Sequence, residues 1–105
     1  MNENKGPKEI QVELSDTVAE GVYSNLVIVS HSDSEFIFDF ARFLPGKPKA
    51  KIHSRVIMNP KNARLFLNAL SDNIKKYEAR FGKIKVGDSD KPKIGIRPDN
   101  EDTVN

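Results

Sequence analysis

Two neighbouring segments of this chain, residues 23–31 (YSNLVIVSH) and 35–43 (EFIFDFARF), are apolar on both of their alternating faces. Strands of an antiparallel sheet usually carry polar side chains on one face, because that face meets water. A strand that is apolar on both faces must be covered from two sides. This requirement constrains the fold more than any other feature of the sequence.

Four strands are predicted. The two apolar segments are rich in β-branched and aromatic residues, and turn-forming residues separate them, so they predict an antiparallel hairpin. Residues 44–48 (LPGKP) predict a connecting turn, because two prolines cannot donate to a ladder. Strict alternation predicts a further strand at residues 49–58 and a short one at residues 10–14.

A long helix is predicted at residues 60–81. Asn59 is a favoured N-cap residue, Pro60 suits the first helical position, and Gly82 supplies the exit. Apolar residues recur at spacings of three and four between them: Ala63, Leu67, Leu70, Ile74, Tyr77 and Phe81. Such a helix is about 33 Å long, so its C-terminal half should overhang the sheet.

These elements predict an α+β domain of order β-β-β-β-α, with the helix packed on one face of a four-stranded antiparallel sheet. We expect a disordered lead-in at residues 1–9, one domain at residues 10–82 and a mostly flexible tail at residues 83–105. The tail holds two short alternating stretches, so one further strand could form at residues 83–87 or 93–97.

One helix covers one face, which leaves the second apolar face of the central strands open. A second copy of the chain is the economical cover, so we expect a homo-oligomer. The alternative is that residues 10–22 and the tail fold over that face. The apolar residues expected at the oligomer or partner surface are Val27, Val29, Ile37, Phe43, Tyr77 and Phe81.

Composition excludes several kinds of chemistry. The 105 residues contain no cysteine, and the two histidines, His31 and His53, lie on different predicted strands without metal-ligand spacing. No nucleophile turn and no glycine-rich phosphate loop is present. We therefore expect no catalytic residues, no metal, no cofactor and no small-molecule substrate. The longest apolar run is four residues, which indicates a cytoplasmic protein without a membrane segment.

Charge is unevenly distributed along the chain. Residues 1–39 carry eight acidic and two basic residues, whereas residues 41–71 carry seven basic residues and no acidic one. Five of these cations form a candidate polyanion patch: Arg42, Lys47, Lys49, Lys51 and Arg55. Such a patch could neutralise a nucleic-acid backbone, but lysines also protect an edge strand from unwanted pairing.

Asp39 is the acidic residue most deeply set in an apolar segment. It lies among Phe36, Phe38 and Phe40 in the sequence, and a buried carboxylate needs a partner. The nearest cations in the predicted sheet are Arg42 and Arg55. We expect a structural ion pair, with Asp39–Arg55 as the candidate, rather than a catalytic acid.

Several short motifs point to a known family. They include Tyr23-Ser24-Asn25, Ser34-Glu35-Phe36, Asp39-Phe40, Pro45-Gly46, Arg55 to Pro60, Asn73-Ile74, Tyr77-Glu78 and Phe81 to Ile84. In these motifs the chain resembles an uncharacterised prokaryotic family of short proteins, of about 100 residues, that forms a domain of unknown function. The resemblance runs from about Ile10 to Ile84 and implies no activity. The predicted layout alone is similar to the SecB-type export chaperones.

The sequence thus predicts a non-enzymatic, homo-oligomeric protein-interaction module. Its partners would be further copies of itself and a second protein. One alternative is a SecB-like chaperone that holds unfolded polypeptides. A second alternative is nucleic-acid binding through the basic strand at residues 49–55.

Overall fold

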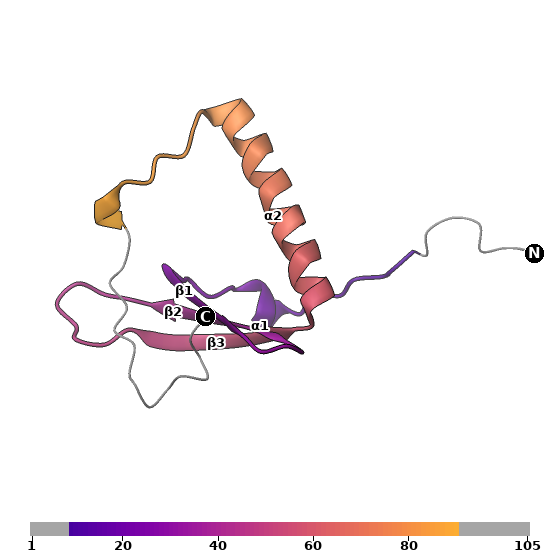
Figure 1. Ribbon diagram of the computed structural model, residues 1–105, viewed down its shortest axis with the longest axis horizontal. Coiled ribbons are helices and arrows are strands. Elements are labelled where there is room, and N and C mark those ends of the chain that lie inside the picture. The colour runs from indigo at the N-terminus through magenta and orange to yellow at the C-terminus, as the bar shows by residue number, and fades with distance from the viewer. Residues whose placement is uncertain (1–8, 91–105) are drawn as a thin grey trace, which may run out of the picture.

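The computed structural model describes residues 9–90 (Figure 1). Its elements follow in the order α1 (Asp16–Ala19), β1 (Leu26–His31), β2 (Phe36–Arg42), β3 (Lys51–Met58), α2 (Pro60–Phe81) and a 3₁₀ turn, η1 (Asp88–Asp90). The expectations for residues 1–8 and 91–105, including a strand at 93–97, lie outside the described residues.

The described residues form an α+β unit with a three-stranded antiparallel sheet of order β1-β2-β3. The predicted hairpin, the strand after it and the long helix are confirmed. The fourth strand predicted at residues 10–14 is not found, because this stretch pairs with neither edge of the sheet and its apolar side chains are 68% to 86% exposed. Residues 10–14 also leave the sheet uncovered. Residues 83–87 form no strand either.

Short-range chemistry explains the connections. The Ser15 hydroxyl accepts a hydrogen bond from the Val18 amide and caps α1. After β2, the Lys47 amide donates to the Leu44 carbonyl, with Pro45 and Gly46 between them. Gly46 has a φ of +83°, so these four residues have the features of a type II turn, which requires positive φ at its third position.

Helix α2 begins and ends as its flanking residues predict. The Asn59 side chain accepts from the Asn62 amide at 2.7 Å, and Pro60 stands at the first helical position. At the other end the Gly82 amide donates to the Glu78 carbonyl, and Gly82 has a φ of +97°, a conformation that side-chain-bearing residues rarely adopt.

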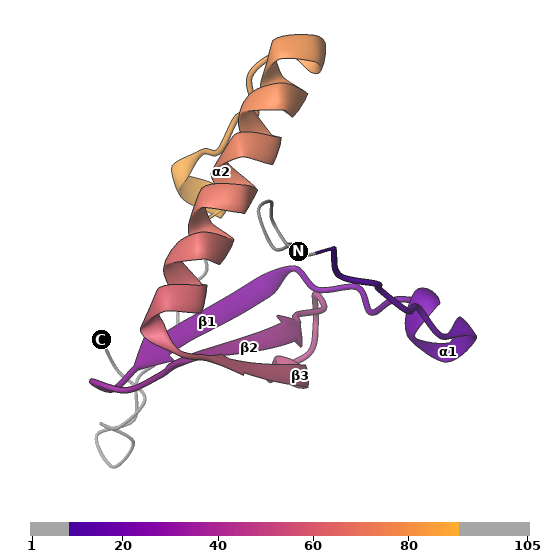
Figure 2. The ribbon, with the colours of Figure 1, turned by 90° about the vertical axis from the view of Figure 1, so that its right-hand side faces the viewer.

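The sequence predicts that the helix packs along one face of the sheet, but α2 does not cover the sheet in this way. Figure 2 shows α2 rising from one end of the sheet and extending well beyond it. Only Asn59 separates the end of β3 at Met58 from the start of α2 at Pro60. A one-residue connection leaves no loop with which the chain could reverse and lay the helix along the strands. No residue of α2 is buried.

The strand register divides the sheet into two faces, because directly opposite residues of an antiparallel pair project to the same side. The helix-side face carries Val27, Val29, Phe36, Phe38, Phe40, Val56 and Met58. The far face carries Leu26, Ile28, Ser30, Ile37, Asp39, Ala41, Arg55 and Ile57.

A β-bulge interrupts the alternation of β3. Phe40 lies opposite Ser54, whereas the next residue, Ala41, lies opposite Ile52, so His53 is the extra residue. Arg42 then pairs with Lys51. Strict alternation along residues 49–58 predicts that Lys49, Lys51, His53 and Arg55 share one strand face, and for Arg55 this prediction is wrong. The bulge separates Arg55 from the cations before it.

Little of this unit is buried. Phe38 and Ala41 are the buried hydrophobic residues among residues 9–90, while 22 large hydrophobic residues remain exposed. Burial of apolar surface is the main favourable term in folding. Most of the large apolar side chains of the described residues are therefore not covered by the rest of the chain.

Candidate functional site

The helix meets the sheet at one aromatic contact. The rings of Phe38 in β2 and Phe66 in α2 lie edge to face, with centroids 5.6 Å apart. Such T-shaped pairs are favourable beyond the area that they bury. This contact orients the side of α2 that bears Phe66 toward the helix-side face. It also fixes where the apolar side of the rest of the helix points.

Four apolar residues continue from Phe66 along the same side of α2 at helical spacing. We call these residues together the helix stripe: Phe66, Leu70, Ile74, Tyr77 and Phe81. The Tyr77 and Phe81 rings lie 5.0 Å apart, which supports their common side. Beyond Phe66, the stripe residues are 38% to 65% exposed.

The helix stripe and the helix-side face diverge from their contact at Phe38 and Phe66 (Figure 1). Both surfaces are apolar, and the exposed valines Val27, Val29 and Val56 belong to the sheet side. We call this open wedge between the two surfaces the apolar angle. It can accept an apolar element of another chain.

The predicted oligomer surface is divided by the structure. Val27 and Val29 lie on the helix-side face, and Tyr77 and Phe81 lie on the helix stripe, so these four border the apolar angle. Ile37 lies on the far face. Phe43, the sixth predicted residue, lies beyond the end of β2, where its amide donates to the Asn25 side chain and its carbonyl accepts from the Asn25 side-chain amide.

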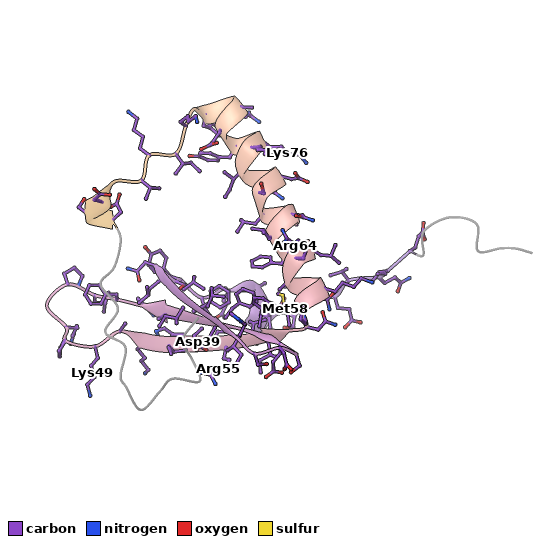
Figure 3. All side chains as sticks on the ribbon, viewed as in Figure 1. Asp39, Lys49, Arg55, Met58, Arg64 and Lys76 are labelled. Carbon is purple, nitrogen blue, oxygen red and sulfur yellow. The ribbon has the colours of Figure 1, made fainter. Side chains whose placement is uncertain are left out.

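Asp39 and Arg55, the pair expected from the sequence, lie directly opposite each other on the far face (Figure 3). Arg55 donates from Nε to Asp39 Oδ1 at 2.7 Å and from Nη2 to Oδ2 at 3.0 Å. The Asp39 side chain is buried, whereas that of Arg55 is half-exposed. The hydrogen bond and then the charge of Asp39 raise the pKa of Arg55 above its ordinary value, against a smaller opposing effect of desolvation. The pair satisfies a buried carboxylate and performs no evident chemistry.

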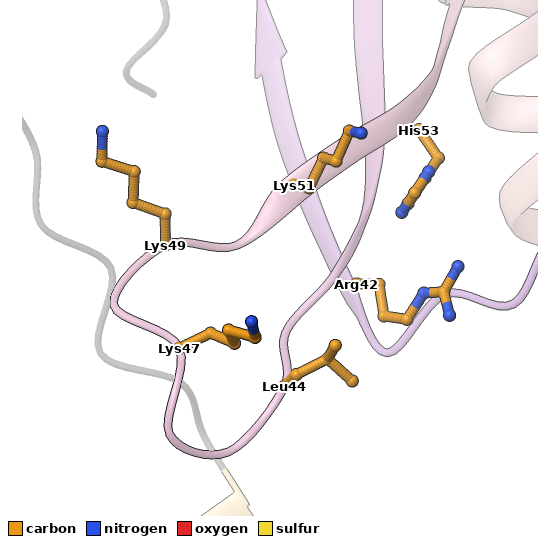
Figure 4. Close-up of a pocket in the computed structure, with 6 residues that line it drawn as sticks. All are labelled: Arg42, Leu44, Lys47, Lys49, Lys51 and His53. Carbon is orange, nitrogen blue, oxygen red and sulfur yellow. The ribbon is translucent and has the colours of Figure 1, made fainter.

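Four of the five predicted patch cations gather around one shallow depression (Figure 4). It lies by the β2–β3 connection, at the end of the sheet away from the start of α2 (Figure 1). The depression holds about 360 Å³ and is lined by Arg42, Leu44, Lys47, Lys49, Lys51 and His53. We call it the basic hollow. Arg55 is not part of it, because its guanidinium is held by Asp39.

Two of these lining residues were not part of the patch predicted from the sequence. Leu44 belongs to the predicted connecting turn, and its proximity to the cations follows from the turn geometry. Strand alternation does place His53 on the face of Lys49 and Lys51, and His53 lines the hollow with them, although the predicted patch does not include it. The turn signal at Pro45-Gly46 could have placed Leu44 and Lys47 together.

Neither a metal-binding cluster nor a membrane-spanning helix is found among the described residues. Within residues 9–90, no three histidine, cysteine, aspartate or glutamate side chains stand close enough together to hold a metal ion. Among the helices described, none combines the length and the apolar character needed to cross a membrane.

Comparison with known proteins identifies the family. A family model described as "Protein of unknown function (DUF3467)" matches residues 1–86. The chain belongs to this family. The resemblance seen in its motifs is thereby confirmed, and the family description assigns no activity. No curated protein and no solved structure matches the chain.

Proposed function

We propose that this member of the family is a non-enzymatic, homo-oligomeric protein-interaction module whose copies associate through the apolar angle. One observation carries the proposal: α2 has 22 residues and an apolar stripe, yet none of its residues is buried. Most of the stability of a protein helix comes from packing of its apolar side rather than from the intrinsic helix propensity of its residues. Beyond its contact with Phe38, the stripe therefore needs a partner.

The open area matches what a dimer needs. The exposed side chains of the apolar angle are Val27, Val29, Val56, Phe66, Leu70, Ile74, Tyr77 and Phe81. From their exposures they leave on the order of 700 Å² of surface open, close to the roughly 800 Å² that each partner contributes to a standard interface. A second copy brings an identical apolar stripe, so a two-fold arrangement buries both.

The absence of cysteine from the chain permits a direct test. Single cysteines are placed along the stripe in four variants, Leu70→Cys, Ile74→Cys, Tyr77→Cys and Phe81→Cys. Around a two-fold axis, a position near the axis meets its own copy, so at least one variant should form a covalent dimer on mild oxidation. Leu65→Cys is the matched control, because Leu65 is equally exposed but lies about 140° around the helix from Leu70. Cross-linking no greater than that of the control in all four variants would contradict the proposal.

A SecB-like chaperone would use the same apolar angle for an unfolded client. An experiment can distinguish an unfolded client from a second copy of the chain, because a client that binds in the apolar angle competes with self-association. If a denatured test protein is kept soluble at stoichiometric amounts and abolishes stripe cross-linking, the angle holds clients. If cross-linking persists and aggregation proceeds, the second copy is the occupant.

A second candidate function, nucleic-acid binding, rests on a separate observation. Arg42 and Lys51 lie directly opposite each other in the sheet, although like charges so placed destabilise a strand pair. Lys47 and Lys49 extend the same positive region, and within residues 9–90 no carboxylate pairs with any of these four cations. Edge protection explains lysines on β3, but it does not explain an arginine on the central strand.

The basic hollow fits the phosphates of a duplex. It is open, and none of its lining residues is a phenylalanine, tyrosine or tryptophan on which single-stranded bases would stack. If four cations each neutralise one phosphate, the logarithm of the binding constant for a labelled duplex should fall with the logarithm of salt concentration with a slope of about −3.6. The double variant Lys47→Glu, Lys49→Glu should halve that slope or abolish binding.

The matched control for this experiment is Lys75→Glu, Lys76→Glu on α2, which changes net charge equally but lies outside the hollow. It should leave the affinity for the duplex unchanged. Equal weakening by both double variants, or no binding by the unaltered protein at low salt, would remove this candidate.

A further inference from the structure

Residues 9–14 have the features of a strand but no strand partner. The segment is extended, and Ile10, Val12 and Leu14 alternate with polar residues and are strongly exposed. Figure 1 shows it running outward past the start of α2, away from its own sheet. Alternation of this kind is typical of a strand with one buried face, yet the apolar face of residues 10–14 is not buried within the described chain.

The described sheet has an open edge that suits this segment. In the order β1-β2-β3 both outer strands lack a neighbour on one side among the described residues. The β3 edge is basic, with Lys51 and Arg55, and the β1 strand contains no acidic or basic residue apart from His31. The segment is acidic, with Glu9 and Glu13, and residues 9–22 contain no lysine or arginine. Charge complementarity therefore selects β3.

We propose that residues 9–14 of one copy add as a fourth strand to the β3 edge of a second copy. This inference rests on the proposed self-association and names a second contact within it. Main-chain hydrogen bonds would supply most of the affinity, as in other cases of strand addition, and the side chains would set the register.

Lys51 defines that register, because it is the cation of β3 that no carboxylate of residues 9–90 holds, whereas Arg55 lies on the far face beyond the bulge and holds Asp39. Glu9 and Glu13 share one face of an extended strand, and either can lie opposite Lys51: Glu13 if the strands run antiparallel, Glu9 if they run parallel. In both cases Gln11 lies beside His53, two residues along from that pair.

Two single-cysteine variants test the contact between copies. Gln11→Cys is mixed with His53→Cys, the mixture is oxidised mildly, and the mixed disulfide is measured by mass spectrometry. The comparison mixture pairs Gln11→Cys with His31→Cys, an exposed position on β1 outside the apolar angle. We expect the first mixture to give several times more mixed disulfide than the second. Equal yields, or a higher yield with β1, would overturn the assignment.

Hydrogen exchange separates this inference from the proposed function. The unaltered protein should protect the amides of residues 10–14, and Glu9→Lys, Glu13→Lys should abolish that protection and weaken association at least tenfold. The control Asp33→Lys, Glu35→Lys changes net charge equally in the β1–β2 connection and should do neither. A protein that has at least a dimer's mass while residues 10–14 exchange freely would refute the strand addition alone. A protein that stays monomeric would refute both.

Discussion

Truncation of Tyr77 tests the helix stripe with a magnitude that follows from the structure. Tyr77 is 51% exposed. For a side chain of its size this is on the order of 100 Å², which is worth about 2.5 kcal/mol if it is fully buried by a partner. A two-fold interface contains the residue twice, so Tyr77→Ala could remove up to about 5 kcal/mol of dimerisation free energy. Partial burial would halve that figure to about 2.5 kcal/mol, and we expect the dimer dissociation constant to rise by about two orders of magnitude.

The same substitution has an opposite effect on the helix itself. Alanine is a better helix former than tyrosine by roughly 0.5 kcal/mol, so Tyr77→Ala should not weaken α2 intrinsically. Weaker association therefore cannot be attributed to loss of helix propensity. Because dimerisation stabilises the folded chain by mass action, the thermal midpoint of the variant should fall most at low protein concentration.

Sedimentation velocity over a dilution series measures the dissociation constant directly. Leu65→Ala is the control, since Leu65 is 54% exposed on the same helix but lies about 120° around it from Tyr77. It should leave the dissociation constant within a few-fold of that of the unaltered protein. A Tyr77→Ala variant that associates as tightly as the unaltered protein, or a Leu65→Ala variant that is weakened equally, would refute the assignment of the interface.

Two further substitutions test features that support these surfaces. Asn59→Ala removes the oxygen that caps the Asn62 amide and should lower the free energy of unfolding by about 1 kcal/mol, while Asn59→Ser should retain most of it; urea unfolding compares the two, and equal losses would contradict the capping role. Arg55→Ala leaves the buried Asp39 carboxylate unpaired, whereas Asp39→Ala leaves a half-exposed guanidinium that water can solvate, so the urea midpoint should fall further for Arg55→Ala, and the reverse order would show that the carboxylate is satisfied in another way.

The parts of the fold that were predicted correctly have local causes. Asn59, Pro60 and Gly82 define the ends of α2 through the hydrogen bonds and dihedral angles of single residues. The turn at Pro45-Gly46 depends on the fixed φ of proline and the positive φ of glycine. Such signals are complete within a few residues, so the sequence alone suffices to read them.

The errors arise where the pairing partner of a segment or the geometry of a connection decides the structure. Alternation at Ile10, Val12 and Leu14 identifies a segment that can form a strand, but not the edge with which it would pair. Likewise, the apolar stripe of α2 identifies the side of the helix that requires a packing partner, but it does not identify that partner. The direction of the helix depends on the single residue between Met58 and Pro60, a geometric effect that periodicity does not encode.

The candidate site was predicted in part for the same reason. Arg42, Lys47, Lys49 and Lys51 come together at the β2–β3 connection, as their closeness in sequence suggests. Arg55 leaves the group because the bulge at His53 reverses the alternation and the register places Arg55 opposite Asp39. A bulge depends on both strands of a pair, and the pattern of one strand does not reveal it.

The mass of the unaltered protein in solution tests self-association directly. Sedimentation equilibrium over a wide concentration range reports that mass independently of molecular shape. Self-association through the apolar angle predicts at least twice the chain mass of 11.8 kDa. A mass of 11.8 kDa at every concentration, from a chain that is folded by circular dichroism, would contradict the central claim.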